Sequence, residues 1–252
     1  MRQAIQKSVN RMKLMNRTNL FFRGTLFSLL PFAAAFSVGK ANAQTVSYSP
    51  GTSYNIAGAL TGYQTFGNQM DGMVVTAFFT SGKSESLIWT ATGASSGGVT
   101  GADWSLNENG DTFGAPWNLN FSSTVSVDRL VIDAIPGHTV FDTGAGGDTP
   151  GSAGGWAFTI LNGNPTPWTA TYKNSVSLNN VFYGDLYGLL DIEFANGFSG
   201  SFSWVSDTDS ATINSVITPT NPVPEPAQTA SLVGVGLGIL ALGHKLRRRW
   251  QS

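Results

Sequence analysis

Between residues 44 and 213 the sequence alternates turn-forming and strand-forming stretches, and this pattern limits the folds open to the chain. Gly, Ser, Thr and Asn recur every few positions, which disfavours helices and favours turns. Runs rich in β-branched and aromatic residues lie between them, at 73–80, 86–92, 123–135 and 156–161. Short strands at this spacing, with no helical stretch between them, predict an all-β fold, namely an antiparallel β-sandwich or jelly-roll-like domain.

The clearest strand pattern lies between residues 181 and 206. Apolar side chains occupy the even positions, and more polar ones the odd positions, of the stretch VFYGDLYGLLDIEF at 181–194. Because side chains alternate between the two faces of a strand, this pattern indicates a half-buried strand with its core side on the even positions. Asn196-Gly197 suits a tight turn, and Phe202 and Trp204 share one face of the stretch that follows. We therefore expect a β-hairpin with both aromatic faces in the core.

Charge is segregated into three zones. The first 43 residues hold seven basic residues and no acid, and residues 227–252 hold four basic residues and no acid. Residues 44–226 carry all 15 carboxylates against only Lys83, Arg129 and Lys173, a net charge of −12. Three zones of different charge predict three different surroundings rather than one globular body. The acidic central zone would repel a phosphate backbone, so nucleic-acid binding is disfavoured.

Residues 1–43 have the organisation of a secretory signal peptide. A basic segment ends at Arg23, and the apolar segment GTLFSLLPFAAAFSV follows it. Ala41 and Ala43 are the small residues that a signal peptidase requires. We expect cleavage after Ala43, so that the mature chain begins at Gln44. Export would then involve signal peptidase and the secretion machinery.

Prolines gather after the β-rich region. Since proline cannot donate a hydrogen bond to a β ladder, we expect an extended linker at 218–226 and a folded domain at 44–217. Residues 227–243 form an apolar, glycine-rich run of 17 residues. As a helix this run would rise roughly 25 Å, close to the bilayer core of about 30 Å. We expect a single C-terminal transmembrane helix followed by a basic cytoplasmic tail at 244–252.

The order of these C-terminal features resembles the PEP-CTERM sorting signal of Gram-negative bacteria. The matching residues are the triplet Pro224, Glu225 and Pro226, the apolar run 231–243, and the basic cluster Arg247, Arg248 and Arg249. The resemblance covers 27 of the 252 residues. It implies that an exosortase, a membrane protease, recognises the Pro-Glu-Pro triplet as its substrate. It also implies that the chain is anchored in the membrane during transit and then reaches the cell surface or the extracellular matrix.

Several kinds of catalytic or binding site are excluded by composition. The chain has no cysteine, and His138 is its one histidine outside the tail. Thiol catalysis, cysteine metal sites and multi-histidine metal sites are therefore ruled out. The stretch GAGGDTPGSAGG, at 144–155, lacks the Gly-Lys-Ser/Thr of a phosphate-binding loop, and no helix-forming segment follows it. We expect a flexible loop there.

Two carboxylates on the strongest predicted strand suggest either catalysis or sugar binding. Asp191 and Glu193 lie two positions apart and so project from one face. They resemble the E-x-D-x-E signature of laminarinase-like glycoside hydrolases, but Leu189 stands where that signature carries its first glutamate, the nucleophile. We therefore assign no catalytic residue. With Tyr183 and Tyr187, these carboxylates would place aromatic rings beside hydrogen-bond acceptors, a combination that suits carbohydrate binding.

Oxygen-rich turns hold carboxylates that could coordinate calcium. The stretches NENGD, DTGAGGD and DTD begin at 107, 142 and 207, although none has the spacing of a calcium-binding loop. Asp, Asn and Gly also suit turns that bind no metal. The candidate ligands are Asp142, Asp148, Asp207 and Asp209, and no other cofactor is expected.

Together these features predict an exported, non-enzymatic all-β protein of the cell surface or biofilm matrix. Its acidic, hydroxyl-rich domain would suit contact with extracellular polysaccharide. A carbohydrate-binding, lectin-like sandwich is the first alternative, and a glycoside hydrolase is the second.

Overall fold

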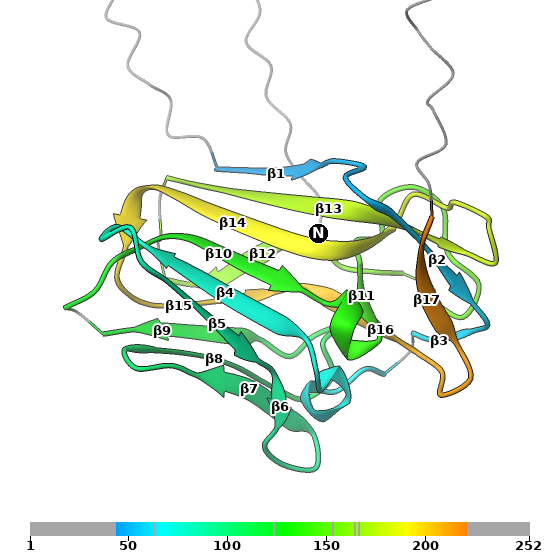
Figure 1. Cartoon of the computed structure of the whole chain (residues 1–252), viewed down its shortest axis with the longest axis horizontal. Coiled ribbons are helices and arrows are strands. Elements are labelled where there is room, and N and C mark those ends of the chain that lie inside the picture. Colours follow the sequence, from blue (N-terminus) through cyan, green and yellow to red (C-terminus); the bar gives the residue numbers. More distant parts are fainter. Residues whose placement is uncertain are drawn as a thin grey trace, which may run out of the picture. The chain divides into compact units, whose positions relative to one another are not determined.

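The computed structural model describes residues 44–220, except Tyr63, Ser123, Ala153, Asn164 and Thr166. This part of the chain is all-β, with two mainly antiparallel sheets and two short 3-10 helices, η1 (Gly67–Met70) and η2 (Ile135–Gly137). The arrangement is consistent with the predicted β-sandwich (Figure 1). Within the same residues no helix is both long and apolar enough to cross a bilayer. The predicted signal peptide and the predicted transmembrane segment lie outside the described residues.

The larger sheet holds eleven strands. Its main path runs in the order β17 (Val216–Thr220), β2 (Ser53–Ala57), β13 (Trp168–Leu178), β14 (Leu186–Phe198), β10 (Val127–Asp133), β4 (Val74–Phe79) and β5 (Ser84–Ile88). Beside this path lie β1 (Gln44–Tyr48) on β13, β11 (Thr139–Asp142) on β14, β16 (Asp207–Ala211) on β11, and β3 (Leu60–Thr61) on β16. Strands β1 and β2 pair with β13 in parallel, and the other pairs are antiparallel.

The smaller sheet holds six strands, all paired antiparallel. Its order is β12 (Thr159–Asn162), β15 (Gly200–Val205), β9 (Trp117–Phe121), β8 (Trp104–Asn109), β7 (Ser96–Thr100) and β6 (Thr90–Ala91).

Aromatic contacts join the two sheets in one main core. Trp117 of the smaller sheet lies 6.2 Å from Phe141 of the larger sheet, measured between ring centroids. Phe79 and Phe121 make an edge-to-face contact between the sheets at 6.3 Å. Such ring pairs contribute about 0.5–1.5 kcal/mol beyond the burial of their area. The chain has no cysteine and therefore no disulfide, so the burial of these large side chains is a main source of its stability.

The core side predicted for residues 181–206 is confirmed along β14 and β15, but the predicted polar side and the predicted hairpin are wrong. Phe182, expected in the core, is 57% exposed, whereas Asp185, Tyr187 and Asp191 of the expected polar side are 2%, 7% and 1% exposed. Leu190 and Ile192 are buried on the core side of β14, and Phe202 and Trp204 are buried on β15. The two strands nevertheless belong to different sheets, since β14 pairs with β10 and β13 while β15 pairs with β9 and β12. The chain crosses from one sheet to the other after β14. Alternation shows which side of a strand faces the core, but it does not identify the neighbouring strand.

The end of the described domain also differs from the expected boundary. Strand β17 continues beyond Ile217 to Thr220, and Pro219 lies opposite Tyr54 of β2. Proline is tolerated on an outermost strand such as β17, because an N–H group that faces away from β2 has no ladder partner on the main path to lose.

Candidate functional site

Three buried carboxylates meet where β11 and β16 run side by side (Figure 1). Asp142 of β11 lies directly opposite Asp207 of β16, and Asp209 lies opposite Val140. Side-chain alternation places these residues on one face of the two strands. One oxygen from each of Asp142, Asp207 and Asp209 lies within 4.8 Å of the others, and the residues are 1%, 2% and 0% exposed. We call this group the aspartate cluster.

The members of the aspartate cluster differ in their hydrogen bonds. Asp207 Oδ1 accepts bonds from the Thr112 hydroxyl at 3.1 Å and from the Thr208 backbone N–H at 2.8 Å. Asp142 accepts a bond from the Ser152 hydroxyl through Oδ2, and one at 2.9 Å from the Gly144 N–H through Oδ1. Neither carboxylate oxygen of Asp209 has a hydrogen-bond partner among the described residues. A buried acceptor left in this state costs about 1–3 kcal/mol, and more if it is charged.

The surroundings of the aspartate cluster disfavour negative charge. Burial, and then the neighbouring Asp209 carboxylate, raises the pKa of Asp207 to about 8. Burial also raises the pKa of Asp209 to about 7. The nearby Ser152 hydroxyl, whose hydrogen bond goes to Asp142, acts to lower this pKa, and the Asp142 carboxylate adds to the rise. The two ion pairs formed within the described residues both involve Asp191 and so do not neutralise the cluster. The site thus concentrates acidic oxygens without a paired basic side chain.

The loop between β11 and Trp156 is held close to the aspartate cluster, although its glycine content predicts a flexible segment. At the end of the loop, the Trp156 N–H donates to the Asp142 carbonyl at 3.0 Å, and the Trp156 carbonyl accepts a bond from the Asp207 N–H at 2.9 Å. In its middle, the buried Asp185 carboxylate accepts bonds from the Thr149 N–H at 2.8 Å and from the Thr149 hydroxyl at 2.7 Å. The Trp156 bonds tie the end of the loop to β11 and β16, and the Thr149 bonds tie its middle to Asp185, just before β14.

Gly155 lies so close to the aspartate cluster that a larger residue would not fit. A Cβ atom on Gly155 would collide with the carboxylate of Asp142. A glycine at this position therefore lets the loop backbone pass directly over the aspartate cluster.

Three of the four candidate calcium ligands come together, and the fourth does not. Asp142, Asp207 and Asp209 form the aspartate cluster, whereas Asp148 is exposed on the loop. Sequence reasoning missed the serine and threonine hydroxyls that bind the cluster and the loop. It also placed Asp185 on a solvated face, but Asp185 is 2% exposed. Only the register between distant segments identifies these partners.

The predicted carbohydrate-binding tyrosines are packed within the domain and lie in different clusters. Tyr187 is 7% exposed, and its ring lies 5.4 Å from that of Tyr48 and 5.8 Å from that of Tyr172. Tyr183 packs instead against a second apolar cluster that contains Ile56. The two rings do not form a shared platform.

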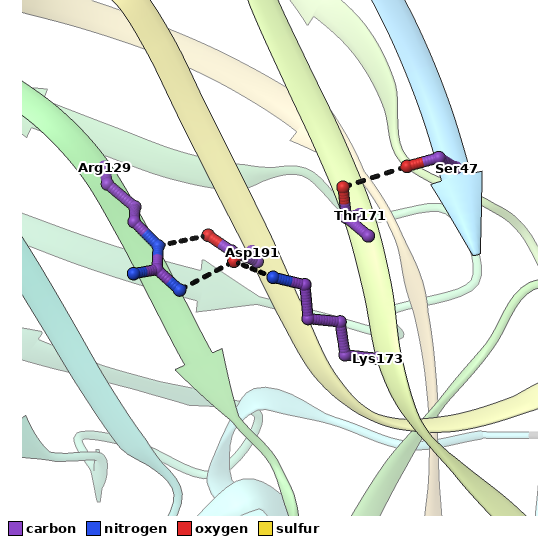
Figure 2. Close-up of polar contacts among 5 residues, drawn as sticks. All are labelled: Ser47, Arg129, Thr171, Lys173 and Asp191. Carbon is purple, nitrogen blue, oxygen red and sulfur yellow. Dashed lines mark hydrogen bonds and ion pairs between the residues drawn. The ribbon is translucent and has the colours of Figure 1, made fainter. Parts of the chain in front are cut away.

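Asp191 is enclosed by two basic side chains (Figure 2). Its Oδ1 accepts a bond from Arg129 Nε at 2.7 Å, and its Oδ2 accepts bonds from Arg129 Nη2 at 2.8 Å and Lys173 Nζ at 2.6 Å. Although burial acts to raise it, these bonds hold the pKa of Asp191 below its ordinary value. Glu193 is exposed on the same strand. Asp191 therefore remains ionised and paired, which does not suit a general acid.

An exposed aromatic pair lies next to the aspartate cluster. Phe113 and Trp156 are 45% and 46% exposed, and their rings meet edge to face with centroids 6.1 Å apart. The backbone of Trp156 forms hydrogen bonds with the backbones of both Asp142 and Asp207. The same bonds therefore hold the aromatic pair next to the aspartate cluster. Sequence reasoning did not single out these rings.

Gln44, the residue after the predicted cleavage site, begins β1. Ala41 and Ala43, the triplet Pro224, Glu225 and Pro226, and Arg247, Arg248 and Arg249 lie outside the described residues. No protein-family model matches the chain, and neither the curated proteins nor the solved structures contain a significant match to it.

Proposed function

We propose that this chain is an exported, non-catalytic β-sandwich protein, sorted to the cell surface or biofilm matrix by a PEP-CTERM-type signal. The observation that carries the proposal is the order of three features in the sequence. The Pro-Glu-Pro triplet at 224–226 is followed by the apolar run 227–243 and then by the basic cluster 247–249. In this proposal an exosortase-type protease cuts at or near the triplet, after the apolar run has anchored the chain in the inner membrane.

Two features of the described domain support this proposal. The last described strand, β17, ends at Thr220, so in sequence the triplet follows the sheets rather than lying within them. Of the two carboxylates considered for catalysis, Asp191 and Glu193, the first is paired with Arg129 and Lys173. A surface role that needs no reacting group agrees with both features.

The sorting signal is tested in the full chain by replacing Pro224, Glu225 and Pro226 with alanine. We expect the variant to remain uncut in the membrane fraction, because the protease has lost its recognition site. The matched control is Pro222→Ala, which removes a nearby proline outside the triplet. Fractionation and intact mass measure the outcome, and unchanged surface delivery of the triple variant would refute the proposal.

A second candidate function is carbohydrate binding, which the exposed Phe113–Trp156 pair favours. Two rings that are nearly half exposed, set edge to face beside buried acidic groups, offer exposed aromatic surface of the kind that sugar rings contact. The test is a glycan array with the full chain, in which Trp156→Ala should abolish specific binding. Tyr187→Ala should impair folding instead, since that ring is buried. Hydrolysis of β-glucans that disappears in Glu193→Gln would contradict the non-catalytic assignment.

A further inference from the structure

We propose that Asp142, Asp207 and Asp209 bind one Ca²⁺ ion that secures the loop 143–155 against β11 and β16. The proposal goes beyond sorting and does not depend on it. It rests on the geometry of the three carboxylates, on the unpartnered state of Asp209, and on the way in which the loop closes over them.

The spacing of the oxygens suits a single ion. Ca²⁺ lies about 2.3–2.6 Å from its oxygen ligands, so two ligands on opposite sides of one ion are about 4.6–5.2 Å apart. The three carboxylates each offer an oxygen within 4.8 Å of the others. One ion placed among them can therefore reach all three without a change of backbone register.

The state of Asp209 is a second observation, separate from the acidity of the cluster, that points to a bound cation. It is 0% exposed, and both of its oxygens lack a hydrogen-bond partner among the described residues. Asp142 and Asp207 each accept hydrogen bonds from nearby donors. Asp209 is therefore the carboxylate whose cost of burial is not offset by such bonds. A buried carboxylate with neither a donor nor a paired basic side chain needs either a proton or a cation.

The ligand chemistry selects a hard cation. All the groups on offer are oxygens, from three carboxylates and from the Ser152 hydroxyl beside Asp142. Six to eight oxygens in irregular geometry suit Ca²⁺, whereas Mg²⁺ requires a near-octahedral set at shorter distance. Zinc and copper favour nitrogen and sulfur ligands, which this cluster does not contain.

A bound ion would also stabilise the position of the loop. Trp156, at the end of the loop, bonds through its backbone to Asp142 and Asp207, and Gly155 passes directly over the Asp142 carboxylate. Three carboxylates confined under this segment repel one another when ionised. A bound cation would reverse that repulsion and hold the strands and the loop together.

The test uses the full chain, purified in mild detergent and stripped with EDTA. CaCl₂ is then added in calorimetric titration and in thermal unfolding. We expect one Ca²⁺ per chain, and a rise in melting temperature of about 5–10 °C when the free ion reaches 100 times its dissociation constant. Asp209→Asn should weaken binding at least about tenfold, because a neutral amide removes one charged ligand.

Two controls separate the site from general effects of charge. Asp148→Asn removes an exposed carboxylate of the same loop, and Asp128→Asn removes an exposed one on a different strand. Both variants should keep the calcium-induced shift in melting temperature. Asp209→Asn is expected to fold without calcium, because it replaces an uncompensated buried charge with a neutral group of similar shape.

Three results would overturn the proposal. One is a wild-type chain that shows neither heat of binding nor a shift in melting temperature up to about 10 mM CaCl₂, roughly ten times the dissociation constant of the weakest extracellular calcium sites. Another is an Asp209→Asn chain that binds Ca²⁺ as tightly as the wild type does. The third is an equal shift with MgCl₂ at the same concentration. If Asp209→Asn fails to fold, Asp142→Asn and the wild-type titration decide the question.

Discussion

Glu108→Gln should make the stability of this protein much less sensitive to pH. Glu108 lies on β8 opposite Trp117, is 0% exposed, and has no hydrogen-bond partner for either carboxylate oxygen among the described residues. Burial, followed by the nearby Asp111 carboxylate, raises the pKa of Glu108 from 4.5 to about 8. The folded chain therefore keeps this acid protonated at pH values where the unfolded chain has lost the proton.

The sign and size of the effect follow from this shift. The pKa of Glu108 is higher in the folded chain than in the unfolded chain. Its contribution to the free energy of unfolding is therefore greatest below pH 4.5 and falls until about pH 8. One pKa unit corresponds to about 1.36 kcal/mol, so the loss across this range is about 5 kcal/mol. Glutamine has nearly the same shape and no proton to lose, so the variant should match the wild type near pH 4.5. It should exceed the wild type by about 5 kcal/mol above pH 8, or about 10–20 °C in melting temperature.

Urea unfolding followed by tryptophan fluorescence, in EDTA and at a series of pH values, measures the difference between the two chains. Other buried carboxylates titrate over the same range, so the difference at each pH is the quantity that isolates Glu108. Glu193→Gln is the matched control, because the same substitution at an exposed position should leave the pH profile unchanged. If the curves for wild type and Glu108→Gln run parallel from pH 4.5 to pH 8, the buried, protonated state of Glu108 is refuted.

Two further perturbations test other parts of the structure. Asp191→Asn should lower the free energy of unfolding by about 2 kcal/mol at pH 7, because the amide carries no negative charge and has one acceptor oxygen fewer for Arg129 and Lys173. The folded pKa of Asp191 is depressed, so its contribution is present above the unfolded value and is lost as pH falls through the folded one. Urea titrations at pH 7 and in acid should show the difference shrinking, and a constant difference would argue against the ion pairs. Gly155→Ala should destabilise the fold by about 1–3 kcal/mol, because the new methyl group meets the Asp142 carboxylate. Gly114→Ala, where an added Cβ meets nothing within 4 Å, should be nearly neutral in the same thermal unfolding assay.

Local patterns predicted the core side of β14 and β15, but neither the burial of their other side nor the strand neighbours. The alternation of Leu190 and Ile192 with polar residues is contained in one stretch of chain, so their burial could be predicted from sequence. The partner of β15 could not be predicted in this way, because Ser201 pairs with Asn120, which lies 81 positions earlier. A turn-forming Asn196-Gly197 therefore suggested a hairpin where the chain changes sheets.

The same distinction applies to the aspartate cluster. Asp207 and Asp209 are two positions apart, so a shared face was predictable from strand periodicity. Their meeting with Asp142 depends on the β11–β16 register, which no local pattern specifies. Nothing in the composition of the loop distinguishes the exposed Asp148 from the buried Asp142. Asp191 was expected on a solvated face because its partner Arg129 is 62 positions away.

The central position of β13 has a consequence for the time at which this domain can fold. Strand β1 pairs with β13 across a separation of 124 residues, and β2 pairs both with β13 and with β17, the last strand among the described residues. A chain that emerges from its N-terminus carries β1 and β2 long before their partners appear. Contacts of such range form slowly, because a large loop must close first. For an exported chain, this topology would delay folding until translocation is nearly complete. The chain would therefore stay unfolded while it crosses the membrane.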